Sequence, residues 1–238
     1  PRQLPPAADA FTWWIRQDEL GRTAHPLAHS SPAELKFVID AAAPFPELEW
    51  AQQVADFPLA EFARTVAMVA YRRDRAANEN AVWPGRTYRL HEILAEGGIC
   101  VDQAYFAATA GKARGVPTLL FHGTGRESRH AWFGFLDGQQ TWRLDAGRHA
   151  EQRFVTGYAL DPQTWRTLSD HELQFLSDRF RERPAFRAAR IHTDFAASFL
   201  AAGDAAQSVA AARRAVALEP RHPPAWDTLV AATRASGA

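Results

Sequence analysis

The residues of this chain that are best suited to chemistry are one cysteine, one histidine and one aspartate. Cys100 is the only cysteine among 238 residues, His130 follows it by 30 positions, and Asp145 follows after 15 more. In this order a thiol, an imidazole and a carboxylate supply a nucleophile, a base and a group that orients the base. The pattern therefore predicts nucleophilic catalysis through the Cys100 thiolate.

The sequence around Cys100 predicts how its sulfur is activated. A glycine pair at positions 97 and 98 leads into an alanine-rich helix expected over residues 101–114, which stops at Gly115. The Cys100 sulfur would then lie at the helix N-terminus, where free backbone N–H groups and the positive end of the helix dipole favour thiolate. Asp102 would lie in the first turn in a structural role, although its charge would partly oppose thiolate formation.

Three segments after this helix predict a small antiparallel sheet. We expect strands over residues 118–122, 130–136 and 141–145, with a turn at Asp137 and Gly138 between the last two. A helix followed by such a sheet makes an α+β unit.

The hairpin formed by the last two strands should bring His130 and Asp145 together. Its register places His130 near Gly147 and Asp145 near Trp132, at the open end of the hairpin. Asp145 would accept a hydrogen bond from one imidazole nitrogen and leave the other nitrogen for the thiol. Asp137 is the competing carboxylate, but it lies at the turn, roughly 20 Å along the strand from His130. Asp145 is therefore preferred.

Together these segments resemble the bacterial transglutaminase-like superfamily. The resemblance is carried, in order, by residues 88–90 with 93–94, 98–104, 113–118, 130–132 and 142–145, and it covers residues 83–150. It implies a papain-like α+β core in which Cys100, His130 and Asp145 form a catalytic triad. It also implies peptidase or amidase activity rather than cross-linking.

An oxyanion formed by attack of the Cys100 sulfur needs hydrogen-bond donors. The backbone N–H of Cys100 is one donor, and we expect the second from an upstream side chain. Trp83 and Tyr88 are the nearest candidates, although either residue could serve packing alone.

Changes in composition divide the chain into three parts. Residues 1–85 are predicted to form helices broken by prolines and to belong to the catalytic domain. Residues 86–168 form the transglutaminase-like catalytic core, and residues 169–238 form a helical tail. The aromatic cluster at residues 11–15 is expected in the core of the first part.

The tail contains a partial sequence repeat with a period of 34 residues. It resembles the tetratricopeptide repeat in its period and its helix-turn-helix pattern. About one and a half repeats are visible, too few to be stable alone, so we expect that the tail packs against the catalytic domain or that the repeats continue beyond Ala238. The large apolar residues at repeat core positions are expected to be buried between helices: Phe195, Phe199, Leu218, Trp226 and Leu229.

Composition argues against several other function classes. Lys plus Arg and Asp plus Glu both total 27, so no charge excess indicates nucleic acid or an anionic membrane as a partner. The apolar stretches are shorter than the roughly 20 residues of a membrane span, which predicts a soluble protein, cytoplasmic or exported after removal of a leader. No metal-ligand spacing, calcium loop, phosphate loop or dinucleotide fingerprint is present, so neither metal nor cofactor is expected.

These observations predict a thiol-dependent hydrolase or acyltransferase that cleaves peptide or side-chain amide bonds through a thioester. Hydrolysis is favoured, because water needs no dedicated acceptor site. The substrate would be a peptide or protein, and the tail could recruit a protein partner. The alternative is a catalytically inactive transglutaminase-like module that binds a peptide or protein.

Overall fold

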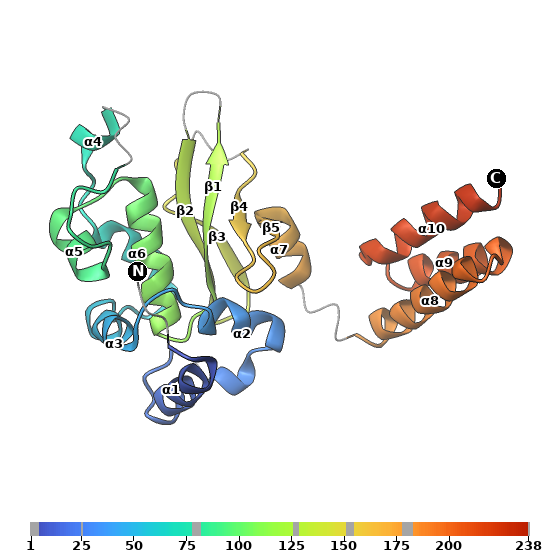
Figure 1. Cartoon of the computed structure of the whole chain (residues 1–238), viewed down its shortest axis with the longest axis horizontal. Helices are drawn as coiled ribbons and strands as arrows, with labels where there is room; N and C mark the ends of the chain where they lie inside the picture. The colour runs from blue at the N-terminus through green and yellow to red at the C-terminus, as the bar shows by residue number, and fades with distance from the viewer. Residues whose placement is uncertain are drawn as a thin grey trace. The chain divides into compact units, whose positions relative to one another are not determined.

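The structure is a computed structural model that describes residues 5–24, 26–77, 82–125, 129–150, 155–177 and 183–237, with the backbone alone for residues 175–177. The chain forms two compact units, residues 1–174 and residues 175–238. Figure 1 traces both units along the chain. Among the described residues, no helix is long and apolar enough to cross a membrane.

Helices make up the first part of the larger unit. They are α1 (Ala7–Glu19), η1 (Leu27–His29), α2 (Pro32–Ile39), α3 (Phe45–Val54), η2 (Leu59–Met68), α4 (Arg73–Ala77) and α5 (Leu90–Glu96). The start of α2 is fixed by a local polar contact. The Glu34 carboxylate accepts hydrogen bonds from the Ser31 backbone N–H at 2.7 Å and from the Ser31 hydroxyl at 2.9 Å. These contacts satisfy groups that a helix start would otherwise leave unpaired.

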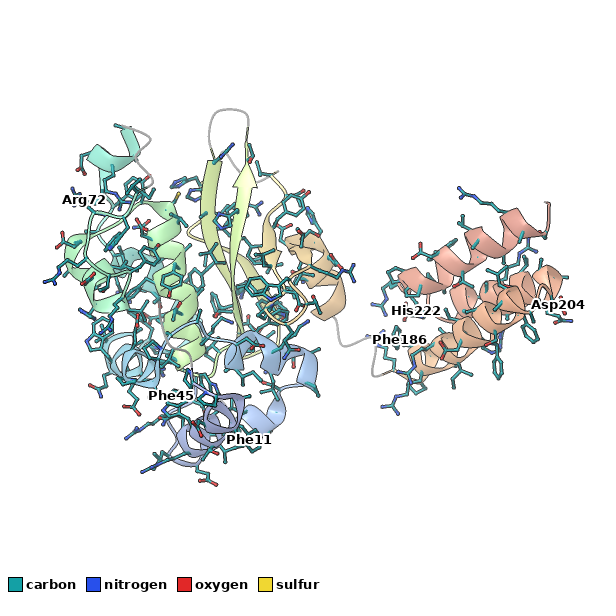
Figure 2. All side chains as sticks on the ribbon, in the orientation of Figure 1. Phe11, Phe45, Arg72, Phe186, Asp204 and His222 are labelled. Atoms are coloured by element: carbon teal, nitrogen blue, oxygen red, sulfur yellow. The ribbon has the colours of Figure 1, made fainter. Side chains whose placement is uncertain are left out.

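The N-terminal aromatic cluster lies only partly in the core. Trp13 and Trp14 are buried, and the Trp13 ring stacks on Phe45 with centroids 5.1 Å apart. Phe11 is 70% exposed and points away from the unit, as Figure 2 shows, and Ile15 is also exposed. The expected burial of the whole cluster is therefore wrong for Phe11 and Ile15. Successive residues of a helix point to different sides, and only one side of α1 faces the core.

The larger unit has the predicted α+β fold with an antiparallel sheet. The strands are β1 (Thr118–Thr124), β2 (Arg129–Leu136), β3 (Trp142–Ala146), β4 (Tyr158–Leu160) and β5 (Thr167–Ser169). Their order in the sheet is β3-β2-β1-β4-β5, and each neighbouring pair is antiparallel. Helix α7 (Asp170–Ser177) follows β5 directly. The first three strands match the predicted segments within two residues at each end.

Helix α6 (Cys100–Ala113) packs against the central strands. Its residues Ala107 and Ala108 share a buried apolar cluster with Phe133 of β2. The hydroxyl of Thr118, the first residue of β1, donates to the Ala108 carbonyl oxygen at 2.6 Å. Helix α6 is antiparallel to β1, and this contact joins the start of β1 to the later part of α6. The first residue of α6, Cys100, therefore lies toward the end of the sheet where β1 finishes and β2 begins.

A buried carboxylate stabilises the turn between β2 and β3, and the pairing of these two strands is irregular. Asp137 Oδ1 accepts hydrogen bonds from the backbone N–H groups of Gln139 at 2.9 Å and Thr141 at 3.0 Å. Beyond this turn the pairing shifts between positions 133 and 135 of β2. The shift places three steps of β3 opposite two steps of β2, which is a β-bulge.

The smaller unit is a set of three helices packed on small residues. They are α8 (Pro184–Ala201), α9 (Ala205–Leu218) and α10 (Pro223–Ala235). Ala189, Ala215 and Ala225 form its buried cluster, each fully inaccessible to solvent. The rings of Phe186 and His222 meet edge to face, with centroids 4.9 Å apart, near the starts of α8 and α10 (Figure 2).

The large apolar residues of the tail are less buried than the repeat pattern predicts. Phe195 is 55% exposed and Trp226 is 46% exposed, while Phe199, Leu218 and Leu229 are half-buried. The expectation of full burial is therefore wrong. Alanines occupy the helix–helix contacts and bring the backbones close, so the bulky side chains lie beside the contact rather than within it.

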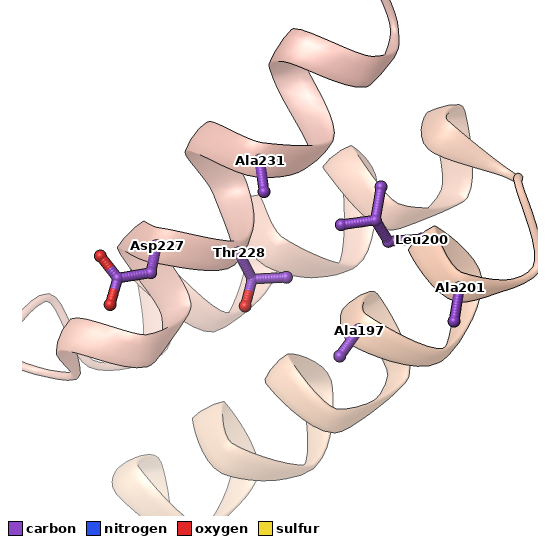
Figure 3. A pocket seen from close by; sticks show the side chains of 6 residues that line it. All are labelled: Ala197, Leu200, Ala201, Asp227, Thr228 and Ala231. Atoms are coloured by element: carbon purple, nitrogen blue, oxygen red, sulfur yellow. The ribbon is translucent and has the colours of Figure 1, made fainter.

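A shallow apolar groove runs between α8 and α10, as Figure 3 shows. It is lined by Ala197, Leu200, Ala201, Asp227, Thr228 and Ala231. Its lining carries a single carboxylate and none of the residues that the sequence assigns to chemistry.

Candidate active site

Cys100 is the first residue of α6, and its side chain is partly accessible. The backbone before it is held by pairing with residues 70–72. The Gly98 N–H donates to the Ala70 carbonyl oxygen, and the Arg72 N–H donates to the Gly98 carbonyl oxygen, each at 2.8 Å. Gly97 has a φ of +72°, and a Cβ on it would lie 2.6 Å from the Ala70 oxygen. The glycine pair is therefore required by this close approach.

The same pairing brings Tyr71 beside Cys100, which the sequence did not predict. Tyr71 forms an isolated parallel bridge with Gly98 and is 45% exposed. Burial of the phenol, and then the charge of the Cys100 thiolate, raise the pKa of Tyr71. No local motif marks this tyrosine, because its partner lies 27 positions further along the chain.

His130 lies at the start of β2 and is buried, at 7% exposed. Its Nε2 atom is 2.8 Å from the Gly147 carbonyl oxygen. The ring stacks on His149 with centroids 4.1 Å apart and on Trp132 with centroids 5.9 Å apart. The predicted proximity of His130 and Gly147 is confirmed by this contact. Strand alternation gives His130 the same face as Trp132, whose ring lies under the Arg148 guanidinium at 4.4 Å.

Asp145 lies in β3 and is exposed. Within the described ranges no hydrogen bond joins its carboxylate to His130, and the Gly147 carbonyl oxygen takes the position expected for it. The bulge explains the difference, because it shifts the alternation of side chains between Arg143 and Ala146. The Trp132 Nε1–H donates to the carbonyl oxygen of Leu144, the residue before Asp145, at 2.8 Å.

Cys100 and His130 lie at the same end of the sheet without being hydrogen-bonded to each other in the part of the chain that the structure describes. Helix α6 packs on β1 and β2, and its N-terminus lies toward the end of the sheet at which β2 begins. The structure thus places Cys100 and His130 toward the same end of the sheet.

A second imidazole lies at this end of the sheet. By its pairing with β2, His122 of β1 shares the face on which Phe133 packs against α6. From the contact between Thr118 and Ala108, His122 is about 13 Å along the strand and Cys100 about 12 Å along the helix. Burial lowers the pKa of His122, which favours the neutral ring.

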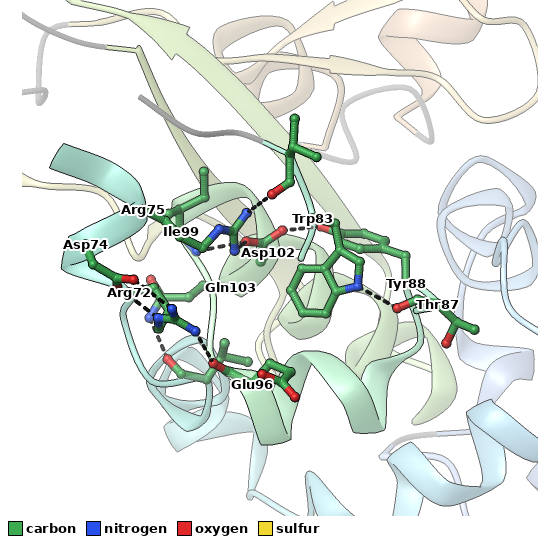
Figure 4. A network of polar contacts seen from close by, with 12 residues as sticks. Arg72, Asp74, Arg75, Trp83, Thr87, Tyr88, Glu96, Ile99, Asp102 and Gln103 are labelled. Carbon is green, nitrogen blue, oxygen red and sulfur yellow. Dashed lines mark hydrogen bonds and ion pairs between the residues drawn. The ribbon is translucent and has the colours of Figure 1, made fainter. Parts of the chain in front are cut away.

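The two upstream candidates for the oxyanion donor already donate their protons elsewhere. Trp83 Nε1 donates to the Thr87 carbonyl oxygen at 2.6 Å, and the Tyr88 hydroxyl donates to Asp102 Oδ1 at 2.7 Å (Figure 4). Burial and the hydrogen bond to Asp102 raise the pKa of Tyr88. Neither residue presents a donor to a substrate at Cys100 in this arrangement.

No metal cluster is found near these residues. Within the residues that the structure describes, no group of three or more histidine, cysteine, aspartate or glutamate side chains could hold a metal ion.

Comparison with known proteins gives little. No protein-family model matches the sequence, and no curated protein matches it. Among solved structures, the chain is similar to the crystal structure of a putative cysteine protease from Cytophaga hutchinsonii, with 17% sequence identity and a TM-score of 0.39. The similarity covers 56% of this chain and 46% of that chain, so this chain spans less than half the length of the protein it matches.

Proposed function

We propose that this protein is a thiol-dependent hydrolase or acyltransferase that acts on peptide or side-chain amide bonds. The observation that supports this proposal is the placement of Cys100, partly accessible, as the first residue of α6 at the end of the sheet where His130 opens β2. The free backbone N–H groups and the dipole of this 14-residue helix stabilise a thiolate at that position.

In the proposed reaction the Cys100 thiol gives its proton to His130, and the sulfur attacks the carbonyl carbon of an amide. The C–N bond then breaks, the leaving amine takes the proton from the imidazolium, and a thioester remains on Cys100. His130 next removes a proton from water or from a second amine, whose attack on the thioester releases the thiolate. Hydrolysis is favoured because water needs no dedicated site.

This reaction requires His130 to reach the Cys100 sulfur. Its Nε2 donates to the Gly147 carbonyl oxygen, which leaves Nδ1 as the basic nitrogen that would take the thiol proton. Asp145 is the third member of the proposed triad and would help to orient the ring. The backbone N–H of Cys100 would donate to the oxyanion, and the hydroxyl of Tyr71, a half-exposed residue paired with Gly98, is our candidate for the second donor.

Mass spectrometry of the protein incubated with a peptide library and an added primary amine tests the proposal. Cleaved peptides identify a hydrolase and amine adducts identify a transferase. Cys100→Ser and His130→Ala should abolish either product, while His122→Ala should retain it. Products that vanish with His122→Ala and persist with His130→Ala would assign the base to His122. Peptides recovered bound and unmodified would overturn the enzymatic proposal.

A catalytically inactive peptide-binding or protein-binding module is the second candidate. It is supported by the exposed Phe195 and Trp226 of the smaller unit, which suit contact with a protein partner. In that case Cys100→Ser would leave peptide binding unchanged.

A further inference from the structure

Asp102 is the centre of a buried polar network beneath the start of α6 (Figure 4). Its side chain is 3% exposed and accepts three hydrogen bonds. Oδ2 accepts from the Ile99 N–H at 2.9 Å and from Arg75 Nη1 at 2.8 Å, and Oδ1 accepts from the Tyr88 hydroxyl at 2.7 Å. Three donors therefore hold this carboxylate in place.

Arg75 is as deeply buried as the carboxylate that it pairs with. Its side chain is 5% exposed, and its Nη2 atom donates to the Val82 carbonyl oxygen at 3.2 Å. The guanidinium also lies 5.6 Å from the centroid of the Trp83 ring. A buried charge of this kind is tolerated only with its partner, because loss of one member leaves the other uncompensated.

The network includes the first turn of α6, which also carries the nucleophile. Asp102 is two residues after Cys100 in the first turn of α6, and it holds the N–H of Ile99, the residue just before the helix. A Cβ on Gly98 would lie 2.4 Å from the Asp102 Cβ, so the backbone leading into Cys100 passes against this side chain. Without Arg75, a bare negative charge would lie within one helical turn of the sulfur and oppose its ionisation.

We infer that Arg75 is a positioning residue for the Cys100 nucleophile. Its guanidinium pairs with Asp102, so this carboxylate anchors the start of α6 without placing a net negative charge beside the thiol. Asp102 can therefore cap the helix without its charge opposing formation of the Cys100 thiolate. The inference rests on the proposed role of Cys100 as the nucleophile.

The test is the rate of Cys100 alkylation by iodoacetamide in the full chain, measured from pH 6 to pH 9. Over this range the phenols of Tyr71 and Tyr88 stay protonated, because burial raises the pKa of each. The profile therefore reports on Cys100 and on the nearby imidazoles. Arg75→Met should slow alkylation at pH 7 by about tenfold and move the profile to higher pH. Arg75→Lys keeps the positive charge, so its alkylation rate should fall by less.

Arg72→Met is the matched control. Arg72 lies in the same segment, pairs with Asp74 at 2.7 Å and donates to the Glu96 carbonyl oxygen at 3.2 Å, and it is much more exposed than Arg75. Its alkylation profile should match that of the unmodified chain. The double variant Arg75→Met/Asp102→Asn removes both charges and should recover at least part of the lost rate, which a purely structural role for Arg75 does not predict.

Three outcomes separate this inference from the proposed function. Equal slowing by Arg72→Met and Arg75→Met, or no recovery in the double variant, would overturn the inference alone. A wild-type rate no faster than that of a free thiol would overturn the proposed nucleophile, and the inference with it. A shifted profile in a protein that modifies no peptide would support the inference and contradict the proposed catalysis.

Discussion

The Nε2 atom of His130 lies 2.8 Å from the carbonyl oxygen of Gly147. A carbonyl oxygen only accepts hydrogen bonds, so Nε2 must carry a proton. In the neutral ring the basic nitrogen is then Nδ1. Gly147 thus fixes the tautomer of His130, which is the task that a carboxylate performs in a catalytic triad.

Asp145→Asn should therefore cost less than the removal of a triad carboxylate usually does. We expect a fall of about tenfold or less in kcat/KM for the peptide cleaved, because Gly147 already sets the tautomer. Removal of a directly bonded carboxylate costs about 10⁴-fold in kcat. The measurement is a steady-state assay of both proteins across pH 6–9. A loss near the larger value would place Asp145 in direct contact with His130 during the reaction.

Gly147→Ala should disturb both the backbone and the imidazole. Gly147 has a φ of +85°, and an added Cβ would lie 3.0 Å from Val66 Cγ2. We expect a loss of about 1–3 kcal/mol in the free energy of unfolding, together with slower Cys100 alkylation. Gly138→Ala is the control, because its φ is not in the left-handed region and its Cβ would be 3.8 Å from the nearest side-chain atom, on Leu59. Equal losses in both variants would contradict this prediction.

Lys112 should make stability rise with pH above neutrality. Its ammonium donates to the Phe37 carbonyl oxygen, and burial lowers the pKa of Lys112 to about 7. An unfolded lysine titrates near 10.4, so between these values the unfolded chain binds a proton that the folded chain does not. The contribution of Lys112 to the free energy of unfolding is least favourable below pH 7, and it increases by about 2 kcal/mol from pH 7 to pH 9.

Urea unfolding at pH 6, 7 and 9 measures this effect. As the pH rises, the unfolding free energy of the unmodified chain should increase relative to that of Lys112→Met. Lys36→Met is the control, because Lys36 forms an ion pair with Asp161 near the surface. Parallel pH curves for the unmodified chain and Lys112→Met would show that Lys112 remains charged in the folded state.

The smaller unit should tolerate loss of an aromatic side chain better than growth of an alanine. Trp226 is 46% exposed, so Trp226→Ala should cost about 1 kcal/mol. Ala215 is fully buried between helices, and Ala215→Leu should cost about 1–3 kcal/mol or more through overpacking. Thermal unfolding followed by circular dichroism compares the two. A larger loss for Trp226→Ala than for Ala215→Leu would contradict this prediction.

Local signals were sufficient to predict much of the fold. Helix α6 begins one residue before the predicted start and ends one residue before the predicted end. Gly115, at a φ of +70°, ends it as a helix stop should. Strands β1, β2 and β3, and the Asp137 turn between β2 and β3, also follow from residues that are close in sequence. Such signals act within a few residues and need no knowledge of tertiary contacts.

The candidate site was only partly predictable for a related reason. The contact between His130 and Gly147 follows from hairpin register, whereas the bulge between Arg143 and Ala146 changes which way Asp145 points. The approach of Tyr71 to Gly98 depends on two segments separated along the chain. Bulges and isolated bridges are settled by tertiary packing, so alternation alone does not reveal them.

The alanine contacts of the smaller unit have a consequence for how related sequences can diverge. Ala189, Ala215 and Ala225 leave no volume for a larger side chain, so these positions should change rarely and only together. Phe195 and Trp226 lie outside the contacts, so they can change without unfolding the helices. The surface of this unit can therefore acquire new specificities while its interior keeps the same three small residues.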